Sequence, residues 1–184
     1  MTSFDISLSG SLRWVKVGAE AELYQLQKGQ DVIGRLTWNS RCGTLADAEC
    51  AEGRWTFKRV GCFDPFVTVR AYGSERTLAT FRPRLSGGGL LELEHGNVIE
   101  FNASDLWGHR WVFLEPEGSV LLDIRVDHGG GFLGALRPEG IIDIREASVM
   151  KPELPLVLCL GWYLILLLER EMDPTMAATL AALV

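Results

Sequence analysis

The residues of this sequence best suited to chemistry are the basic side chains between Gly53 and Arg84. This stretch holds seven basic residues against Asp64 and Glu75, a net charge of +5 in a chain whose formal net charge is −6. Guanidinium and ammonium groups bind phosphate oxygens through charge-assisted hydrogen bonds. The alternative is a solvated surface on which acidic neighbours pair with these charges. Four basic residues are expected on the outer faces of neighbouring strands and form the candidate site for an anionic lipid head group: Lys58, Arg70, Arg82 and Arg84.

The three histidines offer little support for catalysis. His95, His109 and His128 lie at or near predicted turns and share no spacing typical of metal ligands. His109 with Asp105, or His128 with Asp127, could transfer protons, but no recognised motif places a serine or cysteine nucleophile beside them. We therefore predict no catalytic residue and no enzyme activity.

The four cysteines contain no C-x-x-C pair, and the first 20 residues lack a continuous apolar core of signal-peptide length. We therefore expect a cytoplasmic protein with free thiols, with a structural disulfide or zinc site as the alternative. No metal site and no cofactor are predicted. The acidic net charge disfavours nucleic acid as a partner.

The elements that must position these residues are short strands. Gly-centred turns recur about every twenty residues, each between runs that alternate apolar and polar side chains. Alternation is clearest where Trp55 and Phe57 alternate with Thr56 and Lys58, and it indicates sheets with one buried face. We predict an antiparallel meander of about twelve strands at residues 22–26, 32–38, 49–51, 54–58, 66–71, 77–85, 90–94, 98–102, 111–115, 120–126, 132–136 and 141–145.

The sequence changes character after Lys151-Pro152-Glu153. Residues 154–168 are rich in leucine and carry no charge, and the prolines fit a first helical turn. A helix that is apolar on every side must be enclosed by protein or by lipid. Its 15 residues fall short of the ~20 that usually span a bilayer. The alternative is a tail-anchored membrane protein in which 154–168 crosses the bilayer.

The predicted fold is therefore a single domain, 1–184, mainly β. It is a closed antiparallel β-barrel of about twelve strands around a buried hydrophobic C-terminal helix at about 154–170. The strands supply too few bulky inward residues to fill a wide barrel, and the helix has no polar face, so each requires the other. Asp173-Pro174 suggests a short last helix at about 174–184.

The hairpin from Trp111 to Ile124 and the apolar helix 154–168 resemble the tubby C-terminal-like superfamily, within it the small LURP-one-related proteins, with phospholipid scramblases as relatives. The resemblance covers about residues 22–171 and is architectural. It implies a barrel closed around a hydrophobic helix and a mostly non-enzymatic module, because tubby proteins bind phosphoinositide head groups and membranes.

The sequence departs from the scramblases among these relatives in two features. It has no D-x-D-x-D-G calcium loop and no cysteine-rich palmitoylation cluster. We therefore expect a protein peripheral at the membrane that recognises an anionic phospholipid, with a scramblase-like lipid-handling protein as the alternative.

Overall fold

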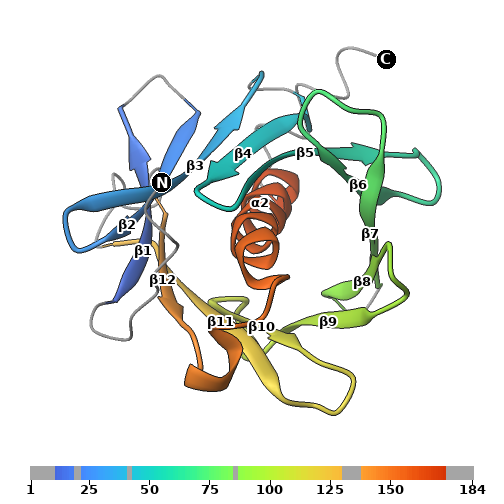
Figure 1. The fold of residues 1–184 in the computed structure, drawn as a ribbon. Helices are drawn as coiled ribbons and strands as arrows, with labels where there is room; N and C mark the ends of the chain where they lie inside the picture. Colours follow the sequence, from blue (N-terminus) through green and yellow to red (C-terminus); the bar gives the residue numbers. More distant parts are fainter. Residues whose placement is uncertain (1–10, 19–21, 41–42, 85–86, 130–137, 173–184) are drawn as a thin grey trace.

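A computed structural model describes residues 11–18, 22–40, 43–84, 87–129 and 138–172, and its strands form one closed antiparallel barrel (Figure 1). The strands follow one another around the barrel in sequence order, and β1 closes it by pairing with both β2 and β12. Their bounds are β1 Leu12–Val17, β2 Leu23–Lys28, β3 Asp31–Trp38, β4 Ala46–Cys50, β5 Gly53–Val60, β6 Phe66–Ala71, β7 Thr77–Pro83, β8 Gly89–Leu93, β9 Val98–Ala103, β10 Arg110–Leu114, β11 Val120–Asp127 and β12 Glu139–Asp143.

The predicted architecture is confirmed, with one difference in the set of strands. β1 was not expected, although Leu12 and Trp14 alternate with a polar residue and both point into the core. The run expected at 132–136 and the tail helix expected at 174–184 lie outside the described residues. The other strands occupy the predicted positions, with ends shifted by a few residues.

The helix α2 (Leu154–Met172) occupies the lumen of the barrel (Figure 1). Every side chain from Leu154 to Leu167 is buried, as expected for a helix without a polar face. Trp162 lies parallel to Trp14 of β1, with 6.4 Å between ring centroids. Tyr163 stacks on Trp38 at 4.8 Å. Within the described residues, no helix has both the length and the apolar character needed to cross a membrane.

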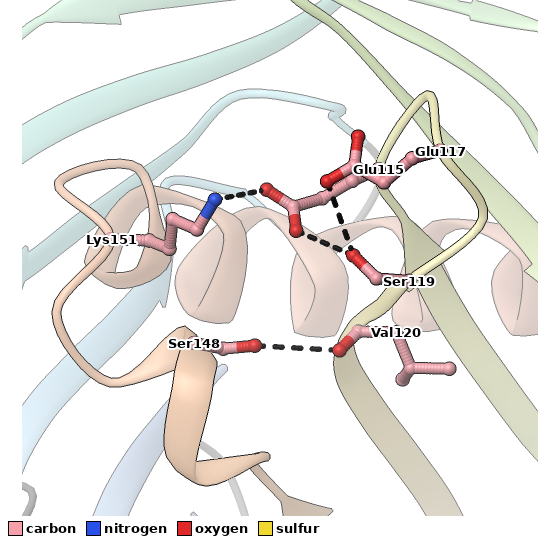
Figure 2. Close-up of polar contacts among 6 residues, drawn as sticks. All are labelled: Glu115, Glu117, Ser119, Val120, Ser148 and Lys151. Carbon is pink, nitrogen blue, oxygen red and sulfur yellow. Dashed lines mark hydrogen bonds and ion pairs between the residues drawn. The ribbon is translucent and has the colours of Figure 1, made fainter.

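Polar contacts hold the segment that leads into α2. This segment begins with a short 3₁₀ helix, η1 (Glu146–Ser148). Lys151 Nζ lies 2.7 Å from Glu115 Oε1, and the Ser119 hydroxyl donates to Glu115 Oε2 at 2.6 Å (Figure 2). The Ser148 hydroxyl donates to the Val120 carbonyl at 3.4 Å. The Lys151 bond is the main cause of a lowered pKa at Glu115. These bonds hold the start of α2 against the β10–β11 turn.

The last turn of α2 is tied to the opposite end of the barrel. Arg170 Nη2 lies 2.6 Å from Glu22 Oε2, and its guanidinium stacks on Trp38, 3.7 Å from the ring centroid. Glu171 forms an ion pair with Arg59 at the end of β5. We call this end the exit rim. Residues 61–65 between β5 and β6, Arg84, Gly87 and Gly88 between β7 and β8, and residues 104–109 between β9 and β10 lie there.

Candidate functional site

The four predicted basic residues lie on the outer wall of the barrel. Lys58, Arg82 and Arg84 are exposed, and Arg70 is half-buried. Lys58 makes no ion pair within the described residues. The other three are each paired with a carboxylate: Arg70 with Glu75, Arg82 Nε with Glu92 at 3.9 Å, and Arg84 Nη2 with Glu100 at 3.1 Å.

Strand register separates these residues along the wall. Lys58 lies opposite Thr68, and Thr68 lies opposite Thr80. Arg82 is therefore displaced from Lys58 towards the exit rim, whereas Arg70 is displaced towards the opposite end. Arg70 and Arg82 are separated by about 13 Å along the strands, at about 3.3 Å per residue. The four charges thus do not converge on one ligand, and only Arg82 and Arg84 lie together near the exit rim.

The histidines are arranged differently from the acid–base pairs considered above. The Asp105 carboxylate accepts the backbone N–H of His109 at 2.9 Å, and Asp127 accepts the backbone N–H of Gly129 at 2.8 Å, so both aspartates stabilise turns. The rings of His109 and His128 instead contact each other, with centroids 5.5 Å apart. His128 Nε2 lies 3.6 Å from the Glu169 carboxylate of α2.

The free thiols described by the structure are those of Cys50, Cys62 and Cys159, while Cys42 lies outside the described residues. Across the described ranges, no group of three or more His, Cys, Asp or Glu side chains is arranged to hold a metal ion.

The β5–β6 connection presents an aromatic side chain to solvent. Gly61 has φ of +86°, and a Cβ there would lie 2.5 Å from the Asp64 carbonyl oxygen, so the turn requires glycine. Phe63 at its tip is fully exposed. A single exposed apolar side chain is common on protein surfaces, so Phe63 is informative only together with other apolar side chains on the same rim.

The β9–β10 connection presents two more apolar side chains on the same rim. The Ser104 N–H donates to the Arg110 carbonyl at 2.7 Å, and the Trp111 indole donates to Gly108 at 2.8 Å. With its backbone held by these bonds, the loop leaves Leu106 and Trp107 99% and 82% exposed. Trp107 differs from the other five tryptophans, which are all buried.

A pocket of about 490 Å³ lies between the last turns of α2 and the wall formed by β5, β6 and β7. Its apolar lining comes from the helix and from the wall, and includes Leu164, Leu167, Leu168, Phe66 and Phe81. Phe63 also lines it. Its charged groups are Arg59, Asp64, Arg84 and Glu171. The pocket therefore combines an apolar interior with arginines, and it includes one of the four predicted residues, Arg84.

The sequence did not predict the exposed positions of Phe63, Leu106 and Trp107. Tryptophans are expected mostly in the core, and apolar side chains are not expected at the tips of turns. A signal was present: Phe63 stands in Gly-Cys-Phe-Asp-Pro, and Leu106-Trp107 stand between Asp105 and Gly108. Apolar residues inside such turn segments are not part of an alternating strand and so have no predicted core position.

Comparisons of the chain with protein-family models, curated proteins and solved structures found no match.

Proposed function

We propose that this protein is a non-enzymatic, tubby-like binding module that docks on a membrane surface through its exit rim and holds an anionic phospholipid head group beside Arg84. One observation carries the proposal: Phe63, Leu106 and Trp107 are exposed on the same rim, and Phe63 lines an apolar pocket there. At the opposite end of the barrel the exposed apolar side chains among the described residues are Val32, Tyr72 and Met150. Tyr72, the aromatic one, is only 48% exposed and its ring lies against the Arg54 guanidinium.

The three apolar tips supply most of the binding free energy. Transferring a large apolar side chain from water contributes about 1.5–3 kcal/mol. Aromatic side chains are well suited to the interface between water and lipid, where the ring is partly buried. Shallow insertion of these tips would also bring the mouth of the pocket to the membrane surface.

Arginine supplies the preference for an anionic head group. The Arg84–Glu100 pair is about 40% exposed on both sides, and screening by solvent leaves such exposed ion pairs little net stabilisation. Phosphate oxygens can therefore replace Glu100 at little cost, and the five donors of a guanidinium suit them. Arg82 lies close by, with its guanidinium 5.7 Å from the Phe66 ring centroid.

The acidic residues of the rim and the net charge of −6 limit the affinity for anionic membranes. Asp64 and Asp105 lie beside the apolar tips. Asp105 already accepts a backbone N–H, which disperses part of its charge. We therefore expect binding in one orientation, through the rim, and not a general attraction of the barrel wall.

The proposal is tested with vesicles of phosphatidylcholine alone and with an added anionic phospholipid. Co-sedimentation measures binding, and quenching by brominated lipid measures the depth of Trp107, the one exposed tryptophan. We expect binding to rise with anionic lipid, and Trp107 emission to shift to the blue. Replacing Phe63 and Trp107 by Ser should weaken binding more than tenfold, since two such side chains contribute about 3–6 kcal/mol.

Charge reversal separates the head-group contact from apolar insertion. Arg82→Glu with Arg84→Glu should remove the preference for anionic vesicles. Met150→Ser is the matched control, because Met150 is 89% exposed but lies before α2, at the opposite end of the barrel. Binding unaffected by the rim variants, or self-association through the same residues without vesicle binding, would refute the proposal.

A further inference from the structure

The pocket at the exit rim is an unfilled space between the central helix and the barrel wall. Its volume of about 490 Å³ lies within the roughly 300–1,000 Å³ typical of sites that enclose small molecules. Protein interiors are close-packed and contain few voids larger than a water molecule. Water fills an apolar space poorly, because each water molecule needs several polar partners. A space of this size and lining therefore suits an apolar ligand.

The helix side of the pocket is a stripe of leucines. Leu164, Leu167 and Leu168 stand at positions i, i+3 and i+4 of α2, so they lie on one face of the helix. Leu164 and Leu167 are buried, and Leu168 is half-buried. The stripe therefore runs from the buried part of the helix out to the rim, and its side chains carry no polar atom. An extended hydrocarbon chain fits such a stripe better than a polar head group does.

The wall side of the pocket is also apolar, and its side chains are held in place by other parts of the barrel. Val67 of β6 and Phe81 of β7 line the pocket, lie directly opposite each other and are buried. The Phe81 ring contacts the Phe101 ring, with 5.9 Å between centroids. A Cβ at Gly89 would lie 2.5 Å from the Phe81 ring, so the backbone of β8 also limits its movement. The wall therefore keeps the pocket open.

The charged groups of the pocket admit one anion. Arg59 forms an ion pair with Glu171, and both residues line the pocket. Arg84 also lines the pocket, but its partner Glu100 does not. Arg84 is therefore the cation that the anionic group of a ligand can reach. Asp64, the other acid of the lining, disfavours a second negative charge by repulsion.

We propose that the pocket takes one acyl chain of the anionic phospholipid, so that the chain lies along the leucines of α2 while the head group remains at Arg84. This inference rests on the proposed function and adds to it the part of the lipid that the protein encloses. The route for the chain is continuous with the docking surface, because Phe63 is exposed on the rim and also lines the pocket.

The free energy of this binding depends on where the acyl chain comes from. A chain that leaves a bilayer passes from one apolar environment to another and gains little. A chain that comes from water gains the full hydrophobic contribution, and each enclosed methylene group then tightens binding about fourfold. A single-chain lipid dissolved in water therefore reports on the pocket, and vesicles report on docking of the rim.

The experiment uses lysophosphatidylglycerol, which has a single acyl chain and a single negative charge, below the concentration at which it forms micelles. Native mass spectrometry of the full-length protein counts the bound lipids, and isothermal titration calorimetry gives the Kd. We expect one dodecanoyl lipid per protein, and an octanoyl lipid should bind about tenfold or more weakly. Equal affinity for the two lipids, or no binding of either, would overturn the proposal.

Variants that fill the pocket locate the bound chain. Leu168→Trp should abolish binding of the dodecanoyl lipid, and Val67→Phe is a second filling variant in case the first fails to fold. Leu93→Trp is the matched control, because Leu93 is also a half-buried leucine packed against the core but lies on β8 at the opposite end of the barrel. Folded filling variants that bind the lipid as tightly as the wild type would overturn the proposal.

The same measurements distinguish the acyl-chain site from membrane docking. Leu106→Ser with Trp107→Ser should weaken vesicle binding far more than lysolipid binding, since neither residue lines the pocket. Vesicle binding without lysolipid binding would overturn the acyl-chain site alone, and lysolipid binding without vesicle binding would refute docking alone. Lysolipid binding that appears only after Leu180 and Leu183 are replaced by Ser would overturn the proposal and assign the pocket to the end of this chain.

Discussion

The half-buried Glu169 carboxyl is the acid with the clearest consequence for stability. Burial raises the pKa of Glu169 to about 7. The nearest base is His128, but burial and the neighbouring His109 lower the His128 pKa. His128 is therefore neutral when Glu169 ionises, and the 3.6 Å between them gives the carboxylate no cationic partner. Tyr24 of β2 also lies close enough for the Glu169 charge to raise its pKa.

We predict that Glu169→Gln stabilises the protein above neutral pH. A carboxyl with a raised folded-state pKa binds its proton more tightly when folded, so stability falls as pH rises from about 4.5 to about 7. Glu169→Gln lacks this loss. Its free energy of unfolding should therefore exceed that of the wild type by about 1–3 kcal/mol more at pH 8 than at pH 5, since one pKa unit corresponds to about 1.4 kcal/mol.

The measurement is urea unfolding at pH 5 and pH 8 for the wild type and the variant. Glu171→Gln is the matched control, because Glu171 stands two positions further on α2 and is exposed. Its effect should be the same at both pH values. Equal pH slopes for the wild type and Glu169→Gln would contradict the assignment.

The fit of α2 in the barrel depends on a glycine in the middle of the helix. A Cβ at Gly161 would lie 2.8 Å from the Phe113 ring and 2.8 Å from Ile124 Cδ1. The Phe113 ring is fully buried against Phe101, 4.7 Å between centroids, and has little room to move. Gly161 therefore lets α2 approach β10 and β11 closely.

We predict that Gly161→Ala destabilises the protein and that Gly161→Val does so by more, about 1–3 kcal/mol from overpacking. The sign of the change in stability shows whether the clash exists, because in a helix without it, replacing Gly by Ala stabilises by about 1 kcal/mol. Guanidinium unfolding of the two variants gives the comparison. An increase in stability for Gly161→Ala would show that the neighbouring side chains yield easily.

The strand that sequence reasoning missed, β1, carries the same local signals as the strands that it found, because Gly18 with φ of +78° follows it directly. The strands from β2 to β11 lie beside a short turn containing glycine, and that turn fixes where each strand begins or ends. β1 has the required alternation, with Leu12 and Trp14 buried, but the run was considered only as a possible signal sequence. Its pairing with β12 joins opposite ends of the chain, which local patterns do not reveal.

Only part of the candidate site could be predicted from the sequence. Lys58, Arg70, Arg82 and Arg84 were placed on the outer wall from alternation alone. Their separation along the wall depends on strand register, and their ion pairs depend on side chains from other strands. Composition and spacing contain no information on either.

A closed barrel and its central helix should unfold together. Each strand is paired on both sides, so no edge strand is free to fray. Without α2 the lumen would lose the side chains from Leu154 to Leu167, and outside the barrel α2 would expose all of them to water. Neither part has a stable alternative, and this mutual dependence predicts one cooperative transition.

We predict that far-UV circular dichroism, which follows the backbone, and near-UV circular dichroism, which follows the packed tryptophans, give coincident guanidinium unfolding curves. Trp14→Ala tests the coupling, because Trp14 belongs to β1 and stacks on Trp162 of the helix. Removing a fully buried tryptophan should lower the free energy of unfolding by about 3–5 kcal/mol, and it should move both curves by the same amount. If the near-UV signal were lost at lower denaturant than the far-UV signal, α2 would be able to loosen inside an intact barrel, and the helix and the wall would be two separate units of stability.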